Sequence, residues 1–80
     1  MPQVKVRLPF HMERFFSQLA KRDLDHVEIE TGTDVNSLVA QLGMDRGEVG
    51  LILVNGQLAK FETLLNDGDT VELYILFAGG

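Results

Sequence analysis

The sequence predicts a small α+β domain, in which one mixed sheet of four or five strands packs against helices. Three observations indicate this class. Segments that alternate apolar and polar residues recur along the 80-residue chain, two segments between them have helical spacing, and an Asn-Gly pair follows one apolar segment. A chain of this length forms one domain, which we assign to residues 1–80.

The first half of the chain contains two predicted strands with a predicted helix between them. The segment QVKVRL alternates, and Pro9 ends it. Residues 11–22 carry apolar side chains at helical spacing and therefore predict an amphipathic helix. The segment HVEIE alternates again, which predicts a strand with Val27 and Ile29 facing the core.

The segment TGTDVNSLVAQLG carries the most complete helix signal in the chain. Thr33 is expected to cap the helix, Asp34 suits its positively polarised start, and Gly43 stands where a left-handed residue commonly ends a helix. The apolar stripe that we expect to be buried consists of Val35, Leu38, Val39 and Leu42.

The second half of the chain predicts a hairpin, a polar turn and a last strand. In VGLILVNGQLA, Asn55 and Gly56 suit a type I′ turn, because both of its central residues need positive φ. Residues 61–65 predict an irregular or single-turn link, and NDGD predicts a turn. The segment TVELYILF is the most apolar on both faces, so we expect it in the middle of the sheet.

Composition argues against several classes of function. The net charge of −5 disfavours nucleic-acid binding, which needs clustered Lys and Arg. The longest apolar run, residues 51–54, is too short to span a bilayer, and no basic-then-apolar leader opens the chain. We therefore expect a cytoplasmic protein that binds neither nucleic acid nor membrane.

The residues offer no convincing active site. His11 and His26 lack ligand spacing, the chain has no cysteine, and neither serine has a nearby base. Asp67 and Asp69 supply too few ligands for calcium, and turn formation explains both. We expect no metal, no bound cofactor and no enzymatic activity of its own.

The printed sequence ends in Ala78-Gly79-Gly80, directly after an apolar strand. Glycine adds neither a side chain nor stiffness, so residues 78–80 are expected to form a flexible tail on a rigid base. The predicted fold gives residues 78–80 no structural role.

Taken together, TGTDVNSLVAQLG, LILVNGQ and LLNDGDTVELYILFAGG resemble the ubiquitin-like sulfur carriers of the β-grasp fold, the ThiS/MoaD group. This group contains the thiamine-pathway carrier and the small subunit of molybdopterin synthase. The resemblance covers nearly the whole chain, and the closing -GD- turn, strand and Ala-Gly-Gly carry most of it. Ile75, Leu76 and Phe77 are bulkier than the residues that often precede Ala-Gly-Gly in the group, so the pathway stays open.

The resemblance implies that Gly80 is the functional residue. A partner enzyme of the MoeB or ThiF type would adenylate its carboxylate with ATP, and sulfur would convert it to a thiocarboxylate. The protein would then be a sulfur-carrying co-substrate, or the non-catalytic subunit of a molybdopterin synthase-like complex, that serves the synthase large subunit or a thiazole synthase. The residues expected to bind partners are Tyr74, Leu76, Phe77, Ala78 and Gly79.

Two other classes of function remain open at this point. The same fold and tail would suit a ubiquitin-like modifier that is joined to lysines, because conjugation and sulfur transfer share the adenylation step. A binding module with incidental glycines is the other alternative. The exposure of Tyr74 and Leu76 is also open, because the predicted helix at residues 11–22 would suffice to bury them.

Overall fold

The computed structural model describes residues 1–76, so the expectations for Phe77, Ala78, Gly79 and Gly80 lie outside the described residues. Its five strands are β1 (Gln3–Arg7), β2 (Val27–Glu28), β3 (Val49–Val54), β4 (Gln57–Leu58) and β5 (Thr70–Ile75). Its helical segments are η1 (Pro9–Phe15), α1 (Ser17–Ala20), α2 (Val35–Gln41) and η2 (Arg46–Glu48). Among residues 1–76, no helix has the length and apolar character needed to cross a membrane.

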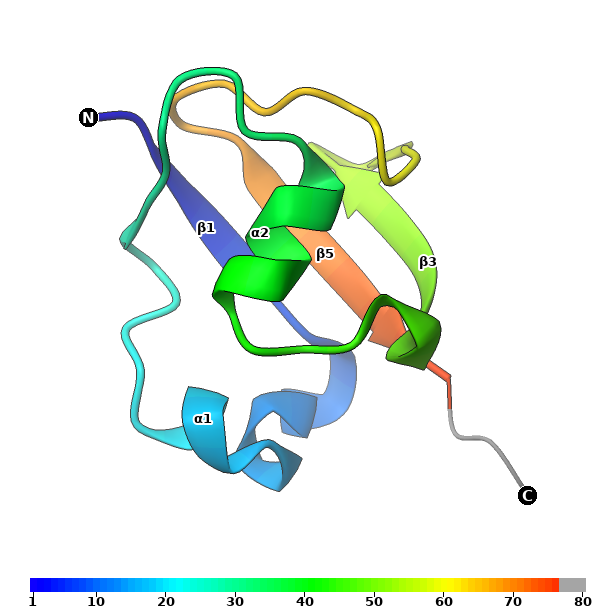
Figure 1. Ribbon diagram of the computed structural model, residues 1–80. Helices are drawn as coiled ribbons and strands as arrows, with labels where there is room; N and C mark the ends of the chain where they lie inside the picture. Colours follow the sequence, from blue (N-terminus) through cyan, green and yellow to red (C-terminus); the bar gives the residue numbers. More distant parts are fainter. Residues whose placement is uncertain (77–80) are drawn as a thin grey trace.

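The five strands form one mixed sheet in the order β2-β1-β5-β3-β4 (Figure 1). The first and last strands of the chain are parallel neighbours, whereas the other neighbouring strands are antiparallel. The prediction that the last strand is central is therefore confirmed. Two short strands, β2 and β4, form the edges, which leaves little free edge for pairing with another chain.

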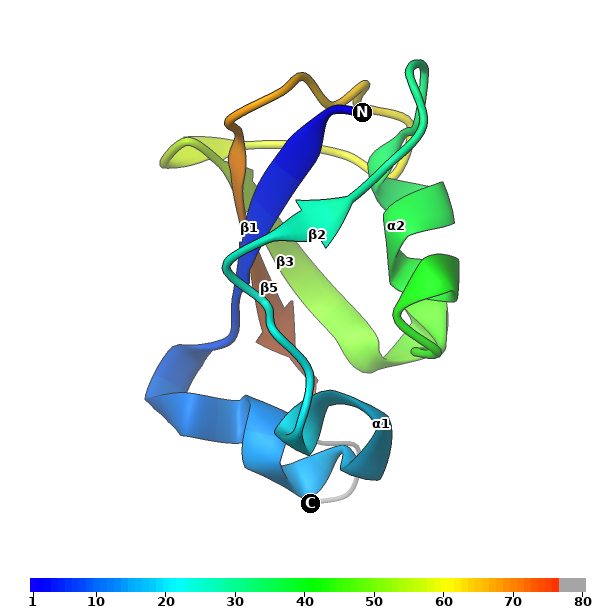
Figure 2. The same ribbon diagram turned by 90° about the vertical axis from the view of Figure 1, so that its left-hand side faces the viewer.

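Helix α2 covers one face of the sheet, and the core lies between them (Figure 2). The predicted apolar stripe is confirmed: Val35, Leu38, Val39 and Leu42 are all fully buried. Gly43 ends the helix with φ +75°, as predicted.

The predicted cap of α2 is wrong by one residue. Asp34, in extended conformation, is the N-cap, and its Oδ1 accepts a hydrogen bond of 2.8 Å from the backbone N–H of Ser37. Thr33 instead donates from Oγ1 to the Glu30 carbonyl at 2.7 Å, which closes the preceding turn. Thr and Asp are both favourable N-cap residues, so residue type alone does not tell which of the two caps the helix. The path of the preceding loop determines it.

The prediction of one amphipathic helix over residues 11–22 is wrong. Phe10 and His11 adopt left-handed φ of 55° and 54°, and Phe16 is extended. These breaks leave a 3₁₀ segment and a single α-helical turn, which together place Met12 and Leu19 in the core. Tertiary packing decides here, because so short a helix has little stability of its own.

The predicted hairpin and polar turn both form, and they are joined to each other. Asn55 and Gly56 have φ of 53° and 82°, as a type I′ turn requires. The Asn55 amide donates from Nδ2 to Asp69 Oδ1 at 2.9 Å, and its Oδ1 accepts from the Thr70 N–H at 2.9 Å. The start of β5 is thereby tied to the tip of the β3–β4 hairpin.

Candidate functional site

The sheet face that α2 does not cover carries a row of apolar side chains. On β5, the fully buried Val71 and Leu73 alternate with Glu72 and Tyr74, which point to the other face. The antiparallel ladder sets Leu51 opposite Tyr74, and such partners share one face. The outer patch, as we name it, consists of Leu51, Leu53, Leu58, Tyr74 and Leu76.

Much of the outer patch is open to solvent. Leu58 is 75% exposed, Leu76 is 59% exposed and Leu51 is 42% exposed, while Tyr74 is half-buried. The segment with η1 and α1 lies at the end of the sheet where β1 and β5 finish, and not over this face (Figure 2). This segment therefore does not bury Leu76. Exposed apolar clusters of this kind commonly mark contact surfaces.

Charged groups border the outer patch on the β1 side. Lys5 and Arg7 alternate with buried valines on β1, which places them on the outer face, and Arg7 stands opposite Glu72. The surface is thus apolar over β3, β4 and the end of β5, and polar over β1. A partner that fits it needs an apolar surface with polar groups on one side.

The Tyr74 hydroxyl is held by its neighbour on the same strand. Tyr74 Oη donates to Glu72 Oε2 at 3.3 Å. The negative charge of Glu72 raises the pKa of Tyr74, and partial burial raises it further. The hydroxyl therefore stays protonated at neutral pH, and the ring presents an uncharged side chain to the outer patch.

The end of β5 is anchored to the chain just before β3. The Leu76 N–H donates to the Glu48 carbonyl at 2.7 Å, one residue beyond the end of the strand. The last described residue is therefore still held by a backbone hydrogen bond, at a point beside the outer patch.

The structure brings together two of the residues that the sequence predicts to bind partners. Tyr74 and Leu76 share the outer face near the end of β5, whereas Phe77, Ala78, Gly79 and Gly80 lie outside the described residues. Sequence reasoning missed three further residues of the patch: Leu51, Leu53 and Leu58. Their hairpin position was visible in LILVNGQL, but the register of β3 against β5 was not.

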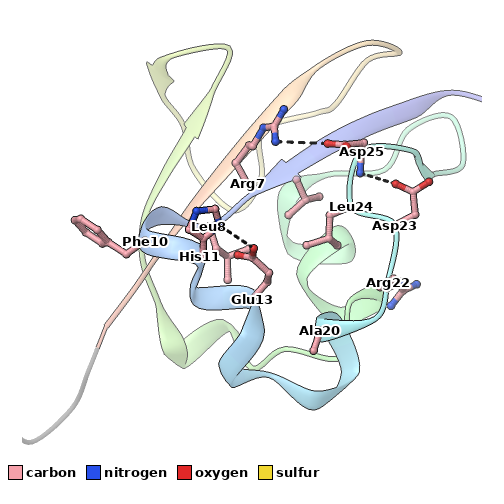
Figure 3. Close-up of a pocket in the computed structure, with 11 residues that line it drawn as sticks. Arg7, Leu8, Phe10, His11, Glu13, Ala20, Arg22, Asp23, Leu24 and Asp25 are labelled. Atoms are coloured by element: carbon pink, nitrogen blue, oxygen red, sulfur yellow. Dashed lines mark hydrogen bonds and ion pairs between the residues drawn. The ribbon is translucent and has the colours of Figure 1, made fainter.

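A hollow of about 630 Å³ lies elsewhere, between the end of β1, η1 and the loop before β2 (Figure 3). In its wall, Arg7 lies 3.5 Å from Asp25, His11 lies 3.6 Å from Glu13, and Arg22 donates to the Gln41 carbonyl at 3.4 Å. The ring of Phe10 points away from it (Figure 3). The hollow shares no residue with the outer patch.

The two histidines are surface residues, as expected. His11 is 88% exposed, and His26 Nδ1 lies 3.0 Å from Asp23 Oδ2. Within the described part of the chain, no three His, Cys, Asp or Glu side chains gather as metal ligands. Asp67 and Asp69 serve the turn, since Asp67 Oδ1 accepts from the Gln3 N–H and Asp69 Oδ2 from the Asn66 N–H, both at 2.8 Å.

Two solved structures share this fold over nearly their whole length. The putative molybdopterin converting factor subunit 1 from Pyrococcus furiosus is 27% identical, with a TM-score of 0.68 over 94% of this chain and 98% of that chain. Urm1 from Trypanosoma brucei is 25% identical, with a TM-score of 0.65 over 98% of this chain and 95% of that chain. The expected ubiquitin-like β-grasp fold is therefore confirmed.

Comparison with protein families and with curated proteins gives one assignment. None of the curated proteins matches the chain. A family model does match: it is described as Mut7-C ubiquitin and covers residues 1–79, which is almost the entire sequence. The resemblance to small ubiquitin-like proteins that the sequence indicates is thus supported by family and by fold. The chain belongs to the Mut7-C ubiquitin family.

Proposed function

We propose that the protein is a sulfur carrier whose sulfur travels as a thiocarboxylate on Gly80. The observation that carries the proposal is the position of β5: the central strand of the sheet ends at Ile75 beside an exposed apolar patch, and Ala78-Gly79-Gly80 follows in the sequence after Leu76 and Phe77. The resemblance to ThiS/MoaD carriers supports it. So does the similarity to a protein named as a molybdopterin converting factor subunit.

The chemistry needs a partner, because a carboxylate is a poor acyl donor. A MoeB- or ThiF-type enzyme would join the Gly80 carboxylate to the AMP part of ATP and release pyrophosphate. Sulfide would then attack the carbonyl carbon and form the carbon–sulfur bond, while the bond from that carbon to the phosphate oxygen breaks and AMP leaves. A persulfide would instead form an acyl disulfide with loss of AMP, and a second thiol would have to cleave its S–S bond, forming a disulfide with the donor's remaining sulfur. The product is a thiocarboxylate, which an acceptor enzyme for molybdopterin or thiamine synthesis would use as its sulfur source.

The fold divides this task between a rigid body and a narrow tail. The Glu48 carbonyl at the end of η2 holds the Leu76 N–H, and the outer patch gives a partner apolar surface to dock against. Glycines at positions 79 and 80 let the backbone pass close to the walls of a channel, because they carry no Cβ. In this scheme the carrier contributes position, and the partner contributes ATP and catalysis.

Mass spectrometry of the intact chain tests the proposal. The 80-residue protein is incubated with an adenylating enzyme of this type, ATP and a sulfide donor. Wild type should gain the mass difference of one oxygen replaced by sulfur. A variant without Gly80 and a variant with one added glycine move the carboxylate by ~3.3–3.6 Å, and should lose loading by ~10²-fold or more.

The controls separate the alternatives. All three forms should melt at nearly the same temperature, because no core residue is changed. Equal sulfur loading of all three would overturn the carrier proposal, and so would an absence of loading in wild type. Wild-type adducts on partner lysines, without sulfur gain, would instead favour a ubiquitin-like modifier.

A further inference from the structure

Gly50 lies directly beneath the side chain of Leu76. A Cβ built on Gly50 would stand 2.5 Å from Leu76 Cγ, 2.6 Å from Cδ2 and 3.2 Å from Cδ1. Ordinary contacts of a Cβ begin at about 3.4 Å, so Leu76 would have to withdraw by about 1 Å. The missing side chain of Gly50 is therefore what allows Leu76 to rest on β3.

The contact between Gly50 and Leu76 depends on an irregularity in β3. Val49 stands opposite Ile75, but Leu51 stands opposite Tyr74, so Gly50 is an extra residue in β3. A bulge of this kind commonly redirects a neighbouring side chain. The Leu76 N–H reaches back to the Glu48 carbonyl at 2.7 Å, so residues on both sides of Val49 hold the same leucine.

Backbone conformation does not explain the glycine. Gly32, Gly43, Gly56 and Gly68 have φ between +75° and +91°, where a side chain is strained, whereas Gly50 lies outside the left-handed region. Alanine at position 50 is therefore acceptable to the backbone. The three atoms nearest to a Cβ at position 50 all belong to the Leu76 side chain, so this contact sets the cost.

We propose that Gly50 is a positioning residue: it leaves room for the Leu76 side chain and so fixes where that side chain stands in the outer patch, against which the adenylating enzyme docks. This inference rests on the proposed carrier function. A Cβ at position 50 would displace the Leu76 side chain by about 1 Å, and misplacement of that size in a positioned reaction costs ~10²-fold in rate.

The contact itself is testable in the free protein. Nuclear Overhauser effects between the Leu76 methyl groups and the Gly50 α-protons should be strong in wild type. Their absence would overturn the proposal, whatever the variants below do. This measurement does not depend on any partner or on the carrier function.

A double-mutant cycle then tests positioning. Gly50→Ala should lower kcat/KM for sulfur loading by about 10–100-fold. In a Leu76→Ala background the clashing atoms are gone, since all three lie beyond Cβ, and Gly50→Ala should change loading by less than about twofold. Gly47→Ala is the matched control, because the three atoms nearest to a Cβ there belong to the Asp45 side chain and lie at ordinary distances of 3.5, 3.8 and 3.9 Å.

The outcomes keep the two proposals distinguishable. If Gly50→Ala lowers sulfur loading only when Leu76 is present, the positioning role of Gly50 is supported. Gly47→Ala should load sulfur like wild type. Equal loading by wild type and Gly50→Ala overturns the positioning role while leaving the carrier function intact. An equal loss in both backgrounds also overturns it, because the effect would not pass through Leu76.

Discussion

Truncation of Leu73 is the most direct test of the core. Leu73 is fully buried on β5, opposite Ile52 of β3, and β1 lies along the other side of the same strand. Because strands flank it on both sides, the site has little freedom to collapse around a cavity. We therefore expect Leu73→Ala to cost about 3–5 kcal/mol, the upper part of the range for buried leucines.

That loss is large for a domain of this size. Eighty residues correspond to a free energy of unfolding of about 4–12 kcal/mol, so the variant loses a large share of it. With a urea m-value of about 1 kcal/mol/M, the midpoint should fall by about 3 M or more, as followed by circular dichroism. Leu38→Ala, on the fully buried face of α2, should cost about 2–5 kcal/mol.

Leu58 provides the matched control, because it is 75% exposed on the edge strand β4. Leu58→Ala should change stability by no more than about 0.5 kcal/mol. A loss below about 1 kcal/mol for Leu73→Ala, or equal losses at positions 58 and 73, would refute the assignment of the two faces.

Two further predictions concern the N-cap of α2 and the turn between β3 and β4. The Ser37 N–H that donates to Asp34 holds the pKa of Asp34 below its usual value. The contribution of this cap to the free energy of unfolding should therefore be complete above the unfolded pKa of about 3.9, and it should be lost as the pH falls through the lower pKa of the folded state. Identical melting temperatures for wild type and Asp34→Asn throughout an acid pH series would contradict this prediction. Asn55→Gly keeps the turn but loses two side-chain hydrogen bonds, each worth about 0.5–1.5 kcal/mol. Asn55→Asp should be less stable still at neutral pH, because it sets a carboxylate against Asp69, and urea melts showing the reverse order would count against this reading.

The sequence predicted those parts of the fold that local chemistry determines. The stripe of α2 follows from helical spacing, the hairpin from Asn55 and Gly56, and the central position of β5 from its apolar character on both faces. Each of these signals lies within one short segment. Each also agrees with the structure that surrounds it.

The failures arise where distant segments decide the outcome. Residues 11–22 have a helical pattern, but the short path from β1 back to the sheet breaks it at Phe10, His11 and Phe16. The outer patch was only half predicted for the same reason. Its β3 and β4 members depend on a register against β5 that includes the bulge at Gly50, and no local pattern encodes that register.

The parallel pairing of β1 with β5 has a consequence for synthesis of the chain. Lys5 pairs with Thr70, and within residues 1–76 the two halves of the sheet, β2-β1 and β3-β4, are joined by β5, the last of the five strands to be synthesised. Until that strand leaves the ribosome, the nascent chain has no closed core, and contacts between such distant residues form late. A product released before residue 70 should stay unfolded and open to proteases. Only chains that have been translated through β5 would then fold.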